Sequence, residues 1–126
     1  MGENRKVQLK LEEIRKLAKT VFLANTCSVE MAEVLANVIV LCERDGPASH
    51  GLFSMYSYVG SLRNGTSNGK AIPTADYPKP GVVRVDGDNG YNQLVINKFT
   101  KDLIRASQEN GIATLTIRTV SYTHLR

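Results

Sequence analysis

Apolar residues recur every three or four positions in the first part of the chain, the spacing of one face of a helix. The first stripe consists of Leu11, Ile14, Leu17, Ala18, Val21 and Phe22. The second consists of Met31, Leu35, Val38 and Cys42, and Ser28 before it offers an N-cap oxygen. The spacing predicts two helices, over residues 11–25 and 28–44, that pack on each other through their apolar faces.

A glycine and a proline follow the second helix in Asp45-Gly46-Pro47-Ala48, where we expect the helix to end and the chain to turn. A third helix is predicted over residues 52–63, with Met55, Val59 and Leu62 facing inward and Gly65 as its stop. Residues 64–80 are rich in Gly, Asn, Ser, Thr and Pro, which indicates an extended connection with a short strand near Ala71.

The pattern changes after residue 80. The run VVRV at residues 82–85 is β-branched and alternating, and predicts a strand that ends in a turn at Asp86-Gly87-Asp88. A helix over residues 92–109 follows, and IATLTI at residues 112–117 predicts a second strand. The inward face predicted for this helix consists of Ile96, Phe99, Leu103 and Ala106. The fold class is therefore α/β (α+β): a helical N-terminal region, residues 1–70, then residues 71–118 as the incomplete beginning of a mixed-sheet domain.

Composition places the chain among soluble globular proteins, since it has 126 residues, 42% of them hydrophobic and 22% charged. There is no bilayer-length apolar run and no secretory pattern at the start, so we expect a cytoplasmic protein without a membrane partner. The net charge of +4 comes from basic residues with acidic ones between them, which argues against a nucleic-acid partner. Cys27 and Cys42 lack the spacing of metal ligands, so no metal site is predicted.

The candidate site lies in ERDGPASHGLFSMYSY, residues 43–58. If a helix begins near His50, then Ser54 and Tyr58 follow at steps of four and line the same side. An imidazole can donate or accept a proton near neutral pH, so His50 is a candidate acid or base for a bound substrate. Tyr58 would donate or orient through its phenol. The residues alone leave a second interpretation open, in which His50 caps a turn and Tyr58 packs its ring.

The segments ERDGPASHGLF, YVGSLRNG, NGKAIP, PGVVRVDG and NGIATLTIR resemble the malate/L-lactate dehydrogenase family over most of residues 7–118. The Glu-Arg-Asp-Gly and Ser-His-Gly-Leu-Phe variants look most like the branch that reduces piperideine and pyrroline carboxylates. The resemblance implies a homodimeric enzyme that uses NAD or NADP on a small 2-oxo acid, 2-hydroxy acid or cyclic imino acid. It also implies a nucleotide-binding domain that is not a Rossmann fold, so the missing GxGxxG motif does not count against it.

Carried over by position, the resemblance makes His50 and Tyr58 the catalytic residues, with His50 as proton donor or substrate ligand. Ser49, Gly51 and Ser54 are the implied substrate-binding positions. Ser54 stands where the family usually has an arginine for the substrate carboxylate, and a serine does not replace a bidentate cation. The cofactor-binding residues are expected beyond the end of this sequence.

The last residues depart from the family pattern. Family members continue with Asn-Ser and a histidine-containing stretch, whereas this chain reads TVSYTHLR from residue 119. We interpret residues 119–126 as an artefactual tail, and His124 is then not the family histidine. The alternative to an enzyme fragment is a non-enzymatic α/β interaction module in which His50 and Tyr58 are structural.

Overall fold

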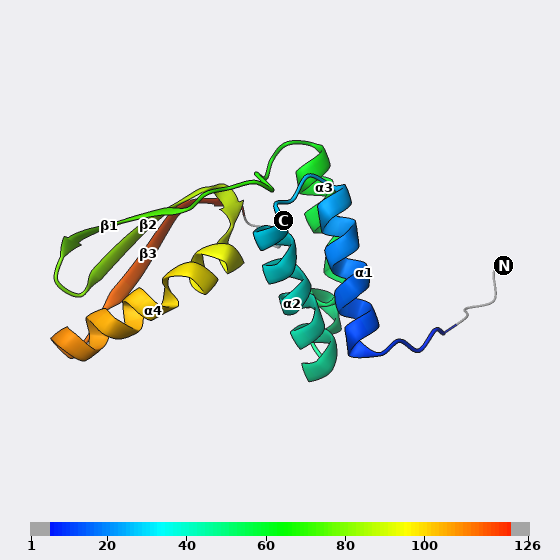
Figure 1. The fold of residues 1–126 in the computed structure, drawn as a ribbon, viewed down its shortest axis with the longest axis horizontal. Helices are drawn as coiled ribbons and strands as arrows, with labels where there is room; N and C mark the ends of the chain where they lie inside the picture. The colour runs from blue at the N-terminus through cyan, green and yellow to red at the C-terminus, as the bar shows by residue number, and fades with distance from the viewer. Residues whose placement is uncertain (1–5, 122–126) are drawn as a thin grey trace.

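The computed structural model describes residues 6–121 and places a helical region beside a three-stranded sheet with its own helix (Figure 1). In chain order the elements are α1 (Leu11–Ala24), α2 (Val29–Asp45), the single 3₁₀ turns η1 (Ala48–His50) and η2 (Leu52–Ser54), α3 (Met55–Arg63), β1 (Thr74–Lys79), β2 (Val82–Tyr91), α4 (Asn92–Asn110) and β3 (Thr114–Ser121). The expected mixed α/β architecture is confirmed. Among the described residues, no helix combines the length and apolar character that a membrane span requires.

The first two helices form as their apolar spacing predicts and build the larger core. Ile14, Ala18 and Phe22 of α1 are buried, and Met31, Leu35 and Ile39 are among the buried residues of α2. The Ser28 hydroxyl accepts a hydrogen bond from the Met31 amide at 3.1 Å, which confirms the predicted N-cap. The α2 helix ends where Gly46 adopts a left-handed conformation (φ 100°), and its amide donates to the Cys42 carbonyl at 3.0 Å.

The third helix begins later than predicted. The chain makes two separate 3₁₀ turns before the α-helix starts at Met55, so the predicted start at residue 52 is wrong. The backbone at Gly51 has ψ −138°, which interrupts helical winding between His50 and Leu52. The end is as expected, since Gly65 has a φ of 75° just after the last turn.

The first strand also lies elsewhere than predicted. It runs from Thr74 to Lys79 rather than near Ala71. Ala71 is 4% exposed and its amide donates to the Asn68 carbonyl at 3.3 Å. Residues 68–71 therefore form a turn that packs on the helical core, and the Ala71 amide does not pair with a strand. The strand forms only where the chain leaves that core.

The second strand continues through the predicted turn. It reaches Tyr91, and the residues expected to reverse the chain form an irregularity between Asp86 and Gly90 instead. Asp88 and Asn89 have φ values of 51° and 55° there. Asn and Asp tolerate this conformation, so a segment with the composition of a turn is accommodated as a bulge.

The sheet has the order β1-β2-β3, with β1 antiparallel and β3 parallel to β2. Helix α4 connects β2 to β3 and covers one face of the sheet (Figure 1). A second, smaller core forms between them from Val83, Val85 and Val95, with Phe99, Ala106, Leu115 and Ile117 packed against it. Ile96, predicted to face inward, is 50% exposed, because the inward face of α4 starts at its neighbour Val95.

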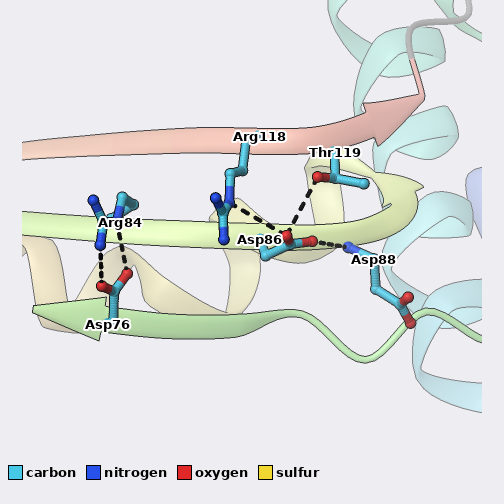
Figure 2. Close-up of polar contacts among 6 residues, drawn as sticks. All are labelled: Asp76, Arg84, Asp86, Asp88, Arg118 and Thr119. Carbon is cyan, nitrogen blue, oxygen red and sulfur yellow. Dashed lines mark hydrogen bonds and ion pairs between the residues drawn. The ribbon is translucent and has the colours of Figure 1, made fainter.

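The other face of the sheet carries charged side chains that pair across neighbouring strands (Figure 2). The Arg84 guanidinium of β2 donates to both carboxylate oxygens of Asp76 of β1, at 3.0 and 2.5 Å. Asp86 pairs with Arg118 of β3 at 3.3 Å. The Arg84 guanidinium holds the pKa of the Asp76 carboxyl below its usual value, through the hydrogen bonds first and the charge second. This face is built for a polar environment rather than for a second layer of apolar helices.

Candidate functional site

The turn that carries His50 is held in place by a carboxylate from the end of α2. Glu43 Oε1 accepts a hydrogen bond from the Leu52 amide at 2.7 Å and thereby caps the first turn of η2. Gly51 is buried beside it, and a Cβ at this position would overlap Glu43 Oε1. The glycine is therefore required so that the carboxylate can reach the backbone. This role of Glu43 was not predicted from the sequence, although Glu43 and Leu52 lie only nine residues apart in the same motif.

His50 ends η1 and its side chain is exposed. Its Nδ1 lies 2.9 Å from the Ser49 hydroxyl, which makes the two neighbours a hydrogen-bonded pair. When the hydroxyl donates, the neutral ring carries its proton on Nε2; when the ring is protonated, Nδ1 donates to the hydroxyl instead. Ser49 thus contacts Nδ1 in both cases, and the direction of the hydrogen bond follows the protonation of the ring.

Ser54 has a local structural contact. Its hydroxyl lies 2.7 Å from the Gly51 carbonyl and 3.0 Å from the His50 carbonyl, to which it donates. The side chain is thus hydrogen-bonded to the backbone of the turn that precedes it. This contact fits a residue that stabilises the turn.

Tyr58 does not share a helical face with His50 and Ser54, because those two residues precede the start of α3 at Met55. The expectation that all three line one side of a single helix is therefore wrong. The Tyr58 ring is 4% exposed and packs edge-on against Phe22 and Tyr91, with ring centroids at 5.8 and 5.0 Å. Its hydroxyl accepts a hydrogen bond from Gln93 Nε2 at 2.8 Å.

Tyr58 belongs to a polar network that joins α3 to the strand-and-helix unit. The Tyr91 hydroxyl donates to the Tyr58 carbonyl at 3.1 Å and lies 2.6 Å from the Ser61 hydroxyl. Burial raises the pKa of the Tyr91 phenol. Gln93 Oε1 is buried and makes no hydrogen bond within residues 6–121. Sequence reasoning missed Gln93 and Tyr91, because their partners lie more than 30 positions away along the chain.

A separate apolar groove of about 820 Å³ lies between α1 and α3. Its lining includes Leu17, Val21, Phe53, Tyr56 and Val59, with Arg63 at the same groove. Phe53 and Tyr56 are 73% and 82% exposed. Neither His50 nor Tyr58 belongs to this lining. Within residues 6–121, the His, Cys, Asp and Glu side chains form no group of three that would hold a metal ion. His124 and the rest of the predicted tail after Ser121 lie outside the described residues, while residues 119–121 complete β3.

Comparison with known proteins gives consistent matches. The family profile described as malate/L-lactate dehydrogenase matches residues 9–125. A Delta(1)-pyrroline-2-carboxylate reductase of Ancylobacter novellus is 35% identical over 111 residues, which cover 88% of this chain and 33% of the relative. A Delta(1)-pyrroline-2-carboxylate/Delta(1)-piperideine-2-carboxylate reductase of Pseudomonas putida is 34% identical, with the same coverage.

Solved structures agree with the sequence matches. The crystal structure of a delta1-piperideine-2-carboxylate reductase from Pseudomonas syringae pvar. tomato superposes with a TM-score of 0.86 at 33% identity, over 90% of this chain and 34% of that one. A sulfolactate dehydrogenase from Methanocaldococcus jannaschii gives a TM-score of 0.82 at 27% identity, over 91% and 33%. The chain spans about a third of the length of these relatives. With a matching profile over nearly all its residues, the chain belongs to the malate/L-lactate dehydrogenase family.

Proposed function

We propose that this chain forms the N-terminal part of an NAD(P)H-dependent reductase that acts on a small cyclic imino acid or 2-oxo acid. The relatives named as pyrroline- and piperideine-2-carboxylate reductases support this substrate class. One structural observation carries the proposal: an exposed imidazole, His50, is held in a braced turn and hydrogen-bonded through Nδ1 to Ser49. The family match favours this enzyme over the alternative of a non-enzymatic interaction module.

In the proposed reaction, hydride adds to the carbon of the C=N or C=O bond and the nitrogen or oxygen takes up a proton. His50 supplies that proton from Nε2, while Ser49 holds Nδ1 and so keeps the ring oriented. The Glu43–Leu52 hydrogen bond fixes the backbone that follows the histidine, so the ring is presented from a rigid turn. Water returns the proton to the exposed ring after each turnover.

Tyr58 remains a predicted site residue, and its surroundings favour one of the two predicted roles, donating a proton or orienting a neighbour. A ring that is 4% exposed and a hydroxyl held by Gln93 favour orientation of α3 over direct proton transfer. Ser54 and Gly51 are proposed to shape the substrate side of the turn through the backbone. Because Ser54 is bound to carbonyl groups, we propose that a cation from another part of the full-length enzyme holds the substrate carboxylate.

The nicotinamide cofactor would supply the hydride. The described residues do not form a cradle for its phosphates where β2 joins α4. Gly87 and Gly90 are closely approached by Val120 and Ala71, so the space that their missing side chains leave is filled by the protein itself. We therefore assign no cofactor contact to these residues. A homodimeric full-length enzyme and a nucleotide-binding domain outside the Rossmann class are parts of the same proposal.

The test uses the full-length enzyme that contains this sequence, assayed by NADH and NADPH oxidation with Delta(1)-pyrroline-2-carboxylate and with a 2-oxo acid. His50→Ala is expected to lower kcat by about 10²–10⁴-fold, the usual contribution of a positioned acid. Ser49→Ala should give a smaller loss and change the pH profile of kcat. Tyr56→Phe serves as the matched control, since its exposed ring makes no described hydrogen bond, and should leave turnover unchanged. Unaltered turnover in His50→Ala would remove the imidazole from the mechanism.

A further inference from the structure

The sequence contains four Asn-Gly pairs, and the fold places them in very different surroundings. They are Asn64-Gly65, Asn68-Gly69, Asn89-Gly90 and Asn110-Gly111. In such a pair the glycine backbone nitrogen can attack the asparagine side-chain carbonyl, because glycine offers no side chain to block the approach. The reaction needs an accessible nitrogen, a side chain that can turn toward it and a backbone able to rotate.

Asn110-Gly111 meets these needs at the C-terminal end of α4. Both residues are exposed, and Gly111 has left α4 with a φ of 79°. Among the hydrogen bonds of residues 6–121, none uses the Gly111 amide, whereas the corresponding Gly46 amide at the end of α2 donates to Cys42. The Asn110 side chain makes one hydrogen bond, from Nδ2 to the Ala106 carbonyl at 2.8 Å, and that partner is itself in the last turn of the helix.

Asn64 is held more firmly than Asn110. Its Oδ1 accepts hydrogen bonds from the Thr66 amide at 3.0 Å and from the Thr66 hydroxyl at 2.7 Å. The amide of Gly65 donates to the Leu62 carbonyl at 3.4 Å. Attack at this pair requires that all three contacts open together.

The two remaining pairs are locked into the junction between the helical region and the sheet. Asn68 donates to Asp88 through Nδ2 and accepts from the Lys70 amide through Oδ1, and Gly69 beside it is buried. Asn89 donates to the Thr66 carbonyl at 3.1 Å, and its glycine is also buried. Reaction at either pair requires that the junction separates.

The geometry points to Asn110-Gly111 as a site of spontaneous deamidation in the folded protein. When the last turn of α4 frays, the Gly111 nitrogen loses its proton to solvent base and bonds to Asn110 Cγ. The Cγ–Nδ2 bond breaks, ammonia leaves with a proton from water, and a succinimide forms. Water then opens the ring at either carbonyl, which yields aspartate or isoaspartate. No oxidant or reductant is consumed, and fraying of a helix end is the local opening with the lowest free-energy cost.

The product changes the connection from α4 to β3. A carboxylate appears beside Glu109 at the negative end of the helix dipole, where charge of that sign is unfavourable. Isoaspartate also inserts a methylene into a backbone that runs close to Gly81, whose carbonyl accepts from the Thr114 amide at 2.8 Å. We expect the α4–β3 connection to loosen while the helical core is unaffected.

The test is peptide mapping by mass spectrometry of the purified chain after incubation at mildly alkaline pH and 37 °C. Cleavage after Lys and Arg separates Asn110, in residues 106–118, from Asn89, in residues 85–98, and from the peptide of residues 64–70 that holds the other two. Fragmentation distinguishes Asn64 from Asn68. In the folded chain Asn110 should convert fastest, at least about tenfold faster than Asn68 and Asn89, because their reaction requires a larger opening. Asn110→Gln should remove the product at this position only.

The same chain in denaturant is the control for intrinsic reactivity, and there the four rates should converge to within a few-fold of one another. Faster conversion at any other pair in the folded chain would overturn the assignment, as would an unmodified Asn110. Equal rates at all four sites without denaturant would also overturn it, because the fold would then give no discrimination.

Discussion

The contact between Glu43 and the backbone at Leu52 can be tested through the glycine between them. Replacing Glu43 with alanine removes the acceptor of a hydrogen bond with a donor–acceptor distance of 2.7 Å. Hydrogen bonds to charged groups contribute about 1.5–3 kcal/mol, so Glu43→Ala should lower the free energy of unfolding by roughly that amount. The Leu52 amide is then left without its partner in a part-buried position.

Gly51→Ala should produce the same loss by another route. The three atoms nearest to the added Cβ all belong to the Glu43 carboxylate end, so the carboxylate must move and release the Leu52 amide. The destabilisation expected is that of the lost hydrogen bond, about 1.5–3 kcal/mol.

A double-mutant cycle separates this explanation from simple crowding. Once Glu43 is alanine, the added Cβ at position 51 meets no carboxylate, so Gly51→Ala should cost clearly less in that background than in the wild-type chain. Urea denaturation followed by circular dichroism gives each free energy, and an unchanged m-value confirms that the same transition is compared. Additive losses, or a neutral Gly51→Ala in the wild-type chain, would refute the coupling between the carboxylate and the turn.

Other contacts give further expected outcomes. Tyr91→Phe removes a buried hydroxyl with two partners and should cost about 1–3 kcal/mol in urea denaturation; no change would show that the network is not stabilising. Burial raises the pKa of the Cys27 thiol to about 11, so iodoacetamide at neutral pH should modify Cys42 and spare Cys27 in the folded chain, with both modified in denaturant. The pKa of Asp76 is lowered by Arg84, so its stabilising effect is present above the unfolded pKa of about 4 and is lost as pH falls below it. Asp76→Asn should flatten this part of the acid stability profile, and an unchanged slope would contradict the pairing.

Local signals account for the elements that the sequence predicted correctly. The α1 and α2 helices are specified by apolar spacing, by the Ser28 cap and by a glycine at Gly46, all of which act within a few residues. The end of α3 and most of α4 follow from the same kind of signal. These features were predictable because the residues that determine them are neighbours in the chain.

Contacts between distant segments decide what the sequence could not predict. The position of β1 depends on Asp86 and Val85 as strand partners and on the burial of Ala71 against the helical core. The continuation of β2 past Asp88 depends on pairing with β3, whose Val120 lies opposite Gly90. A period of two in a short run indicates that a strand forms, but this pattern does not identify the strand's partner or the residue at which the strand ends.

The five predicted site residues divide by what their atoms contact. Gly51 lacks a side chain, and this leaves room for the Glu43 carboxylate to reach the backbone. Ser54 donates a hydrogen bond to carbonyl groups of the turn, and Tyr58 is buried and hydrogen-bonded to Gln93 of α4. Only Ser49 and His50 present an exposed, hydrogen-bonded pair. Most of the motif therefore specifies the shape of the turn, and the proposed proton transfer depends on the remaining pair. Ser54 stands where the family resemblance predicts an arginine, and its hydrogen bonds to backbone carbonyls stabilise the turn whether or not it contacts a substrate.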